Sequence, residues 1–230
     1  MAVTLAFDVY GTLIDTHGVI VALEKRLGDR AFEFSRVWRE KQLEYSFRRG
    51  LMQNYENFAV CTGNALDYTD AYLKASLSLQ DKQELLELYK VLPAFADVEQ
   101  GLARARKAGF RIFAFSNGSA DMVEGLLSNA GIRDYFMGVV SVDDVRSYKP
   151  SPAVYCHFLR RAGAVGADAW LVSSNPFDVI GALSAGMRAA WIKRSTDAVF
   201  DPWGMEPTLT VRSLPDLVGL IGRERSNPNT

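Results

Sequence analysis

Short apolar runs that stop at polar residues recur along this chain, and the first of them begins at the fourth residue. Residues 4–7 are Thr-Leu-Ala-Phe, Asp8 follows, and the chain then turns at Gly11 and Thr12. This pattern is typical of a buried parallel strand that opens into a loop. Because ligands of open α/β sheets lie beyond the carboxyl ends of the strands, Asp8 stands where a nucleophile would be placed. Taken alone, Asp8 is equally consistent with a residue that caps a turn.

From residue 16 to residue 92 the apolar positions follow a helical period instead. Apolar side chains recur every three to four residues, as at Leu23 and Leu27. This spacing predicts amphipathic helices, and strand signals are weak throughout the segment. We therefore interpret residues 16–92 as an all-helical cap domain, inserted into a core domain of residues 1–15 and 93–230.

After residue 93 strand and helix patterns alternate. The predicted strands cover residues 110–115, 138–142, 169–173, 189–192 and, at an edge, 208–211. Amphipathic stretches of about ten to fifteen residues separate them, which implies right-handed βαβ units around a parallel sheet. The predicted fold class is therefore α/β, a doubly wound parallel sheet with an inserted all-helical cap.

Composition narrows the class of protein. The 230 residues are 48% hydrophobic and carry a net charge of −1, too little to attract nucleic acid or an anionic membrane surface. No apolar run approaches the roughly 18 residues of a membrane span, and we expect no signal peptide. Cys61 and Cys156 are far apart and have no metal or redox spacing, so we expect reduced thiols and a cytoplasmic protein.

Polar residues follow each of four predicted strands. Asp8 ends the first strand, Ser116 and Asn117 end the next, Lys149 follows the third, and residues 173–178 follow the fourth. Since parallel strands present their carboxyl ends at one edge of the sheet, these side chains are expected to converge. Any one of them is ordinary at a strand end, but four such groups at one edge indicate a catalytic site.

Four motifs in this order and spacing resemble those of the haloacid dehalogenase superfamily. They are Asp8-Val-Tyr-Gly-Thr12, Ser116-Asn-Gly118, Lys149-Pro150 and Ser173-Ser-Asn-Pro-Phe-Asp178. The helical segment after the first strand fits the same superfamily, and the resemblance extends to about residue 222. It implies a haloacid-dehalogenase-like Rossmannoid core and an aspartyl nucleophile.

Two departures from the phosphatases of this superfamily bear on the reaction. Those enzymes carry a second Asp two residues after the nucleophile, where this chain has Tyr10, and an acidic pair in the last motif, where this chain has Asn175. Tyr10 cannot protonate a leaving alcohol as that Asp does, and Mg²⁺ prefers anionic oxygen ligands that this motif lacks. We therefore predict no metal ion and no cofactor, and keep a small-molecule phosphatase as the alternative function.

The cap carries a second resemblance. Residues 38–46, Trp-Arg-Glu-Lys-Gln-Leu-Glu-Tyr-Ser, are similar to the signature of the L-2-haloacid dehalogenase family, whose Arg falls on Arg39. On a helix of alternating charges, this Arg would otherwise be a solvated residue. The resemblance implies an (S)-2-haloacid dehalogenase, which hydrolyses short L-2-haloalkanoic acids to D-2-hydroxyalkanoic acids and releases a halide ion.

The implied mechanism proceeds through an aspartyl ester. Asp8 displaces the halide from C2 of the substrate, while Arg39 and Asn117 hold the departing ion. Binding of the substrate carboxylate is assigned to Ser116 and to backbone amides near Val9 and Tyr10.

Lys149 and Asp178 complete the implied machinery. Lys149 favours the ionised form of Asp8 and offsets the repulsion between Asp8 and an anionic substrate. Asp178 is the implied base for the water that hydrolyses the ester, and Asn175 helps to orient it. Supporting hydrogen bonds are assigned to Thr12, Tyr155, Ser173 and Ser174.

The apolar part of the pocket is assigned to Tyr10, Leu43, Phe58 and Phe177. Simple core packing is an equal interpretation for each of them. Some relatives carry Trp at the position of Phe177, a change that alters the room left for the halogen.

The remaining expectations concern motion, assembly and the histidines. Cap and core must part to admit substrate, so we expect hinges near residues 15–16 and at Pro93. The family resemblance implies a homodimer formed through the cap. His17 and His157 have no spaced metal-binding partner, and His157 is expected at the surface. A catalytically silent protein that keeps the fold is the third hypothesis.

Overall fold

The computed structural model describes residues 2–226, which contain a six-stranded parallel sheet. The strand order is β3-β2-β1-β4-β5-β6. The strands are β1 (Thr4–Phe7), β2 (Arg111–Ser116), β3 (Gly138–Ser141), β4 (Ala169–Ser173), β5 (Arg188–Ile192) and β6 (Leu209–Val211). The chain adds β2 and β3 on one side of β1 and then returns to add β4 on the other side. This reversal confirms the doubly wound α/β fold, and it places a ligand-binding crevice beyond the carboxyl end of β1.

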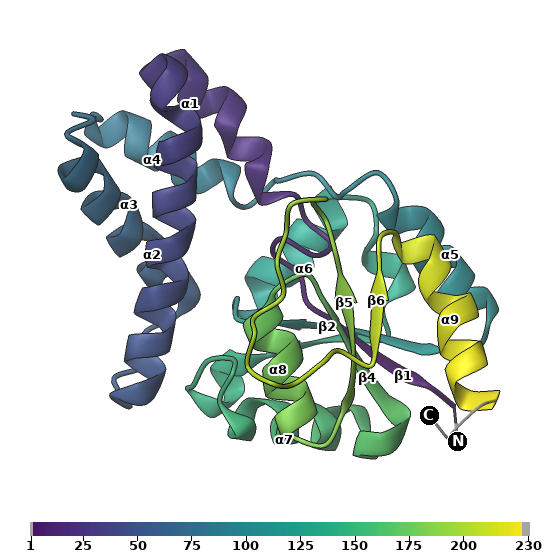
Figure 1. Cartoon of the computed structure of the whole chain (residues 1–230). Coiled ribbons are helices and arrows are strands. Elements are labelled where there is room, and N and C mark those ends of the chain that lie inside the picture. Colours follow the sequence, from purple (N-terminus) through teal and green to yellow (C-terminus); the bar gives the residue numbers. More distant parts are fainter. Residues whose placement is uncertain (1, 227–230) are drawn as a thin grey trace.

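Helices cover both faces of the sheet, because its central strands are apolar on both faces. Every residue of β1 and β4 is buried. Figure 1 shows α5 (Val98–Lys107) and α9 (Leu214–Ser226) on one side of the sheet and α7 (Pro152–Ala162) and α8 (Pro176–Ser184) on the other. The connection between β2 and β3 contains α6 (Ala120–Asn129). Both α7 and α8 begin with proline, which suits the first turn of a helix.

The helices between β1 and α5 stand beside the sheet in Figure 1, and we refer to them as the cap. They are η1 (Thr16–Val19), α1 (Ile20–Leu27), η2 (Gly28–Arg30), α2 (Ala31–Leu51), α3 (Phe58–Leu73) and α4 (Leu79–Leu88). The two longest, α2 and α3, pack together around the buried Trp38, whose Nε1 donates to the backbone oxygen of Thr62 at 2.9 Å. The segment is all-helical, as its periodicity predicts. Its status as a separate domain of residues 16–92 stays a prediction.

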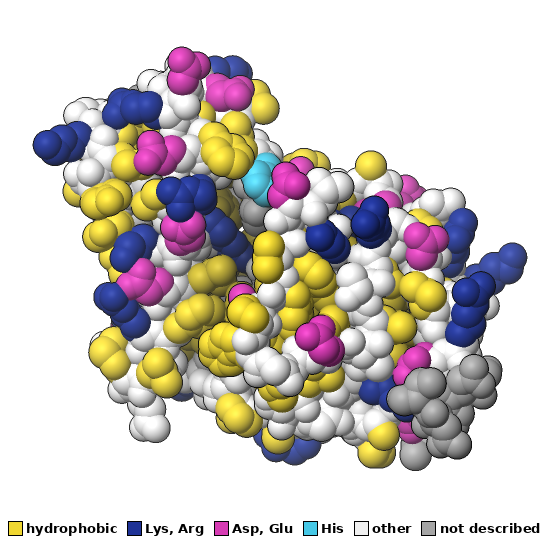
Figure 2. All heavy atoms as spheres, viewed as in Figure 1, with side chains coloured by type: hydrophobic (Ala, Val, Ile, Leu, Met, Phe, Trp, Pro, Cys, Tyr) yellow, Lys and Arg dark blue, Asp and Glu magenta, His cyan; other side chains and the backbone are white. Residues whose placement is uncertain are grey.

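The surface of the cap carries charged side chains among hydrophobic ones, and further hydrophobic side chains lie at its boundary with the core. Figure 2 shows Lys, Arg, Asp and Glu side chains interspersed over the cap, where α2 carries the ion pairs Arg36–Glu40 and Lys41–Glu44. Hydrophobic side chains gather where the cap meets the core. The alternating charges of α2 therefore face solvent, as expected for all but Arg39.

Two crossings of the chain join the cap to the core, and they lie side by side. The backbone NH of Asp15 donates to Pro93 O and that of Phe95 donates to Leu13 O, each at 2.9 Å. Ile14 and Ala94 form an antiparallel bridge between these hydrogen bonds. Both hinges predicted from the sequence fall at this junction.

The remaining short elements include one correction to the sequence analysis. They are η3 (Arg133–Tyr135), η4 (Val142–Val145) and η5 (Gly166–Asp168). His157 was expected at the surface, but it is only 8% exposed and its Nε2 lies 3.1 Å from Asp144 Oδ2. The reason is that His157 shares the inward face of α7 with Val154 and Phe158. Within residues 2–226, no helix has the length and apolar character needed to cross a membrane.

Candidate active site

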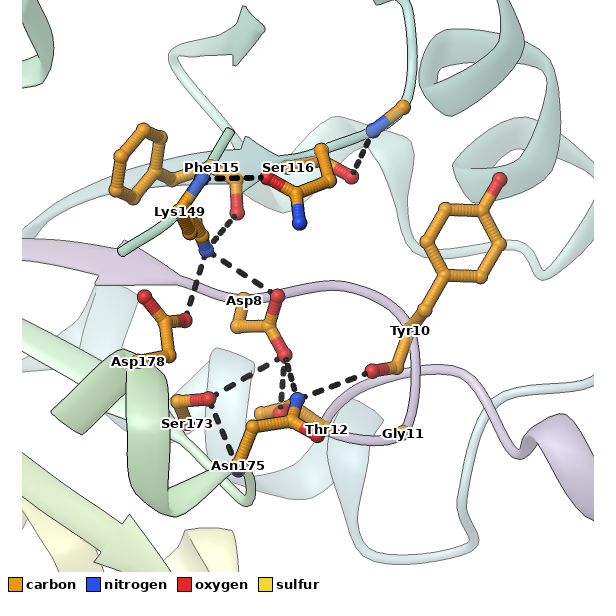
Figure 3. Close-up of polar contacts among 12 residues, drawn as sticks. Asp8, Tyr10, Gly11, Thr12, Phe115, Ser116, Lys149, Ser173, Asn175 and Asp178 are labelled. Carbon is orange, nitrogen blue, oxygen red and sulfur yellow. Dashed lines mark hydrogen bonds and ion pairs between the residues drawn. The ribbon is translucent and has the colours of Figure 1, made fainter. Parts of the chain in front are cut away.

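Asp8 follows β1 directly, and four side chains donate hydrogen bonds to its carboxylate (Figure 3). Thr12 Oγ1 and Asn175 Nδ2 each donate to Oδ2 at 2.8 Å, and Ser173 Oγ donates to the same oxygen at 3.3 Å. Oδ1 accepts from Lys149 Nζ at 3.2 Å. Asp8 is 7% exposed, so this carboxylate lies at the bottom of the crevice with one oxygen more heavily bonded than the other.

Lys149 is a fully enclosed ammonium group at the centre of the site. Besides Asp8, its Nζ donates to Asp178 Oδ2 at 2.8 Å and to the backbone oxygen of Phe115 at 2.9 Å, which uses all three protons. Burial alone lowers the pKa of Lys149, but the charges of Asp178 and Asp8 outweigh it and raise the pKa above 10.5. Lys149 is therefore charged at neutral pH and lies between two carboxylates.

Asp178 is the more deeply buried of these carboxylates. It is 0% exposed, and its Oδ1 accepts from the Tyr155 hydroxyl at 2.8 Å. Burial raises the pKa of Asp178 above 3.8, Lys149 opposes that rise, and the negative charge of Asp8 adds to it. A carboxylate with a raised pKa is a stronger base than an exposed aspartate. A side chain at Gly181 would clash with the Tyr155 hydroxyl, so glycine at this position lets α8 bring Asp178 to Tyr155.

Arg39 reaches the core from the middle of α2. Its Nη2 lies 3.4 Å from the backbone oxygen of Tyr10, and its Nη1 donates to Gln42 Oε1 at 2.6 Å. Gln42 is fully buried and donates in turn to Thr62 Oγ1 at 2.6 Å. A buried chain of amide and hydroxyl groups therefore aims the guanidinium at the loop that carries Asp8.

Ser116 and Asn117 end β2 on the same side of the sheet. The Ser116 hydroxyl accepts from the backbone NH of Gly118 at 3.0 Å, and Asn117 Oδ1 accepts from the backbone NH of Lys149 at 3.1 Å. Both side chains are buried. With its oxygen engaged in this way, Asn117 offers its Nδ2 group as a donor. A side chain at Gly118 would come within 3.2 Å of the Tyr10 ring, so this turn lies against Tyr10.

Aromatic side chains line the boundary between the cap and the site. The Tyr10 ring lies 5.7 Å from Phe58, and Phe177 packs edge-on against Phe47 of α2 at 4.9 Å, both measured between ring centres. A cavity of about 220 Å³ is lined in part by Tyr10 and Phe58. Burial, and secondarily Tyr89, raises the pKa of Tyr10, so its hydroxyl stays protonated. Leu43 is partly buried and lies one turn along α2 from Arg39.

The structure brings most of the predicted residues into one hydrogen-bonded cluster. Its members are Asp8, Thr12, Lys149, Tyr155, Ser173, Asn175 and Asp178, and Ser174 joins it by donating its backbone NH to Thr12 Oγ1. Val9 and Tyr10 form the loop beside it. Leu43 lies outside this cluster, and its backbone oxygen accepts from Ser46 Oγ at 2.8 Å.

Sequence reasoning missed several residues that hold this site. They are Gln42, Thr62, Phe47 and Arg194, the last of which donates to the backbone oxygen of Thr12. Gln42 carries a detectable signal, because it is a polar residue in helical register with the apolar Phe34 and Trp38. No group of three or more His, Cys, Asp or Glu residues suited to a metal ion occurs in the part of the chain that the structure describes.

Comparisons with known proteins give consistent matches. The family model of haloacid dehalogenase-like hydrolases matches residues 3–186. The chain is 38% identical over 217 residues to haloacetate dehalogenase H-2 of Moraxella sp. (strain B), covering 94% of this chain and 96% of that one. It is 37% identical to an (S)-2-haloacid dehalogenase of Pseudomonas sp. (strain YL), covering 94% and 93%. A structure of L-2-haloacid dehalogenase from Xanthobacter autotrophicus with chloropropionic acid covalently bound superposes with a TM-score of 0.89 at 32% identity, covering 96% of this chain and 99% of that one.

Proposed function

This chain belongs to the haloacid dehalogenase-like hydrolases, and from that membership and its site we propose that it hydrolyses short L-2-haloalkanoic acids to D-2-hydroxyalkanoic acids. The observation that carries the proposal is the pairing of a buried Asp8–Lys149–Asp178 cluster with a cap arginine, Arg39, aimed at the nucleophile loop. A related enzyme of the same fold holds chloropropionic acid covalently, as an aspartyl ester route requires.

In the proposed first step, Asp8 attacks C2 of the substrate. The new bond joins a carboxylate oxygen to C2, and the carbon–halogen bond breaks as the halide leaves with its electron pair. We assign the attack to Oδ1, because Oδ2 already accepts from three donors. No proton has to reach the halide, which explains why Tyr10 can occupy the position of the phosphatase acid.

Arg39 and Asn117 receive the halide in this proposal. A planar guanidinium suits a diffuse monovalent anion, and it stabilises charge that develops as the bond breaks. Ser116 and the backbone amides at Val9 and Tyr10 are assigned to the substrate carboxylate. Attack from the side opposite the halogen inverts C2, so an L substrate gives a D product.

In the second step, water attacks the carbonyl carbon of the ester. Asp178 accepts one proton from the water and passes it to the oxygen that leaves with C2. The Asp8 carboxyl then releases the second proton to solvent, which regenerates the carboxylate. The ester carbonyl oxygen is then Oδ2, which lies between the donors of Thr12, Ser173 and Asn175. These donors stabilise the negative charge that the oxygen acquires during the attack.

Two rival functions fit the site less well. A phosphatase needs an acid at Tyr10 and a further anionic ligand at Asn175, and in this chain the Asn175 amide nitrogen faces Asp8. A silent protein would have no need to hold Lys149 between two buried carboxylates, an arrangement that is costly without a use in binding or catalysis.

We further propose that the protein is a cytoplasmic homodimer that associates through the cap. The family resemblance supports the dimer, and so do exposed hydrophobic side chains on the cap helices. Phe32 is 64% exposed, Leu51 86% and Tyr72 62%. Phe32 and Leu51 lie at opposite ends of α2, so these side chains offer partner contacts along the length of that helix.

Halide release that resists chelation is the direct test of the proposed function. Purified protein with excess EDTA is expected to release chloride from L-2-chloropropanoate, and to release little from the D enantiomer, as measured by ion chromatography. Chloroacetate and fluoroacetate belong in the panel, because one relative is named a haloacetate dehalogenase. Phosphate release from p-nitrophenyl phosphate that requires Mg²⁺, without any halide release, would favour the phosphatase instead.

As the pH is lowered, ester hydrolysis is expected to slow at a higher pH than it would if its base were an aspartate with an ordinary pKa. As a base, Asp178 acts only when it is unprotonated, so the rate is full above its pKa and is lost as the pH falls through it. Burial raises the pKa of Asp178 above 3.8, which moves that loss upward. Quenched single-turnover reactions across pH measure the rate, with circular dichroism to verify folding. A hydrolysis rate that stays constant down to about pH 4 would argue against Asp178 as the base.

A further inference from the structure

Arg194 lies two residues beyond β5, and its guanidinium is nearly enclosed, with 15% of the side chain exposed. Nε and Nη2 donate to the backbone oxygen of Thr12 at 3.1 and 2.6 Å, and Nη1 donates to Asp97 Oδ1 at 2.7 Å. The guanidinium carbon is 4.2 Å from the centre of the Phe95 ring. A planar cation that makes two bonds to one carbonyl fixes that carbonyl more firmly than a single neutral donor does.

The carbonyl that Arg194 holds belongs to the residue whose hydroxyl holds the nucleophile. Thr12 Oγ1 donates to Asp8 Oδ2 at 2.8 Å and accepts from the backbone NH of Ser174 at 2.9 Å. Thr12 is fully buried. A shift of its backbone would therefore move the hydroxyl relative to the Asp8 carboxylate.

Arg194 also contacts the segment by which the chain returns from the cap. Phe95, under the guanidinium, donates its backbone NH to Leu13 O at 2.9 Å. Asp97 is itself fixed to the core, because its Oδ2 accepts from the backbone NH of Leu214 at 2.8 Å. The guanidinium is thus anchored on the core and contacts residues beside both crossings between cap and core.

We propose that Arg194 is a positioning residue that holds Thr12 in place for ester hydrolysis. The inference rests on the proposed function, since it concerns the ester formed at Asp8. In that mechanism Oδ2 becomes the ester carbonyl oxygen, and the bond from Thr12 matters most when water attacks and charge builds on this oxygen. Loss of Arg194 therefore slows hydrolysis of the ester more than its formation.

Rapid-quench kinetics of Arg194→Met and Arg194→Lys test this role with L-2-chloropropanoate. For Arg194→Met, ester hydrolysis is expected to slow roughly 10- to 100-fold, the effect of losing charge-assisted hydrogen bonds. Mass spectrometry should then find the Asp8 ester accumulated in the steady state, and kcat and KM should fall together because hydrolysis limits turnover. Arg194→Lys, which keeps the charge without the paired donors, should give an intermediate rate.

Arg188→Met is the matched control, because Arg188 begins the same strand at the end away from the site. It is expected to leave both half-reactions unchanged. The positioning role is overturned if Arg194→Met hydrolyses the ester at the wild-type rate. It is equally overturned if both half-reactions fall by the same factor, since a structural defect predicts that result.

Hydrogen–deuterium exchange without substrate separates this inference from the proposed function. The amides of Leu13 and Ile14 donate to Val9 O, each at 3.0 Å, and belong to the loop that Arg194 holds. Exchange in the peptide of residues 9–15 is expected to quicken in Arg194→Met and not in Arg188→Met. A wild-type protein that releases no halide, together with this exchange difference, would reject the proposed function and leave only the inference that Arg194 holds Thr12 in place. Unchanged exchange would reject the positioning role.

Discussion

Replacing Asp8 by asparagine is expected to abolish halide release, with kcat lower by on the order of 10⁴-fold or more, the usual effect of removing a nucleophile. The amide has no anionic oxygen with which to displace the halide from C2. It also places an NH₂ group among groups that themselves donate to Asp8, those of Thr12, Asn175 and Lys149. Steady-state chloride release from L-2-chloropropanoate, measured by ion chromatography, checks the result.

Asp168→Asn is a suitable control for this substitution. Asp168 lies just before β4, at the end of the sheet away from the site, and its replacement changes the net charge by the same amount. It is expected to leave kcat unchanged. For the Asp8→Asn protein, intact mass spectrometry should show that the amide at position 8 is retained. Full catalysis by a folded Asp8→Asn protein would refute the covalent mechanism.

Replacing Asp178 by asparagine is expected to hold the enzyme at the ester, after the first half-reaction. In the proposed mechanism, ester formation needs Asp8, Arg39 and a charged Lys149, and Lys149 keeps Asp8 as a partner in this variant. Ester hydrolysis loses its base, an effect typically worth about 10²–10⁴-fold. One chloride per active site should therefore appear in a burst, and the peptide that carries Asp8 should gain the mass of the propanoate unit.

Asp121→Asn provides the comparison for this variant. Asp121 and Asp178 both lie in the first turn of a helix that follows a strand, so both substitutions remove the same interaction with the helix dipole. Only the Asp178 variant is expected to accumulate the ester. Multiple turnovers at the wild-type rate by Asp178→Asn would assign the base to another group.

The parts of the fold that the sequence predicts best are those where burial is continuous. β1 and β4 read as apolar runs because they are covered on both faces, and their predicted positions agree with the structure. The long helix α2 has a weaker signal, because buried Gln42 and Ser46 interrupt its apolar face. The last helix was expected over residues 214–221, but it continues to Ser226. Its final turn contains no apolar side chain, so the spacing of apolar residues could not predict it.

The polar ends of the strands were predictable for a topological reason. Parallel strands put their carboxyl ends at one edge, so Asp8 and the loop after β4 that leads to Asp178 had to lie near one another, because β1 and β4 are neighbours. Lys149 lies beyond η4, and the loop after β3 brings it to them. Arg194 also follows a strand, yet a single Arg after β5 looks like a solvated residue until its contacts with Thr12 and Asp97 are seen. The orientation of Arg39 depends on packing between α2 and α3, which periodicity alone does not describe.

The side-by-side crossings near Asp15 and Pro93 have a consequence for engineering and for evolution. Since the polypeptide leaves and re-enters the sheet at a single junction, the intervening lid has two adjacent splice points. Lids taken from relatives can be exchanged there without altering strand order or the aspartate beneath. Because Arg39 comes from the lid, a replacement lid has to supply its own arginine for the proposed halide site, while Asp8, Lys149 and Asp178 stay with the sheet.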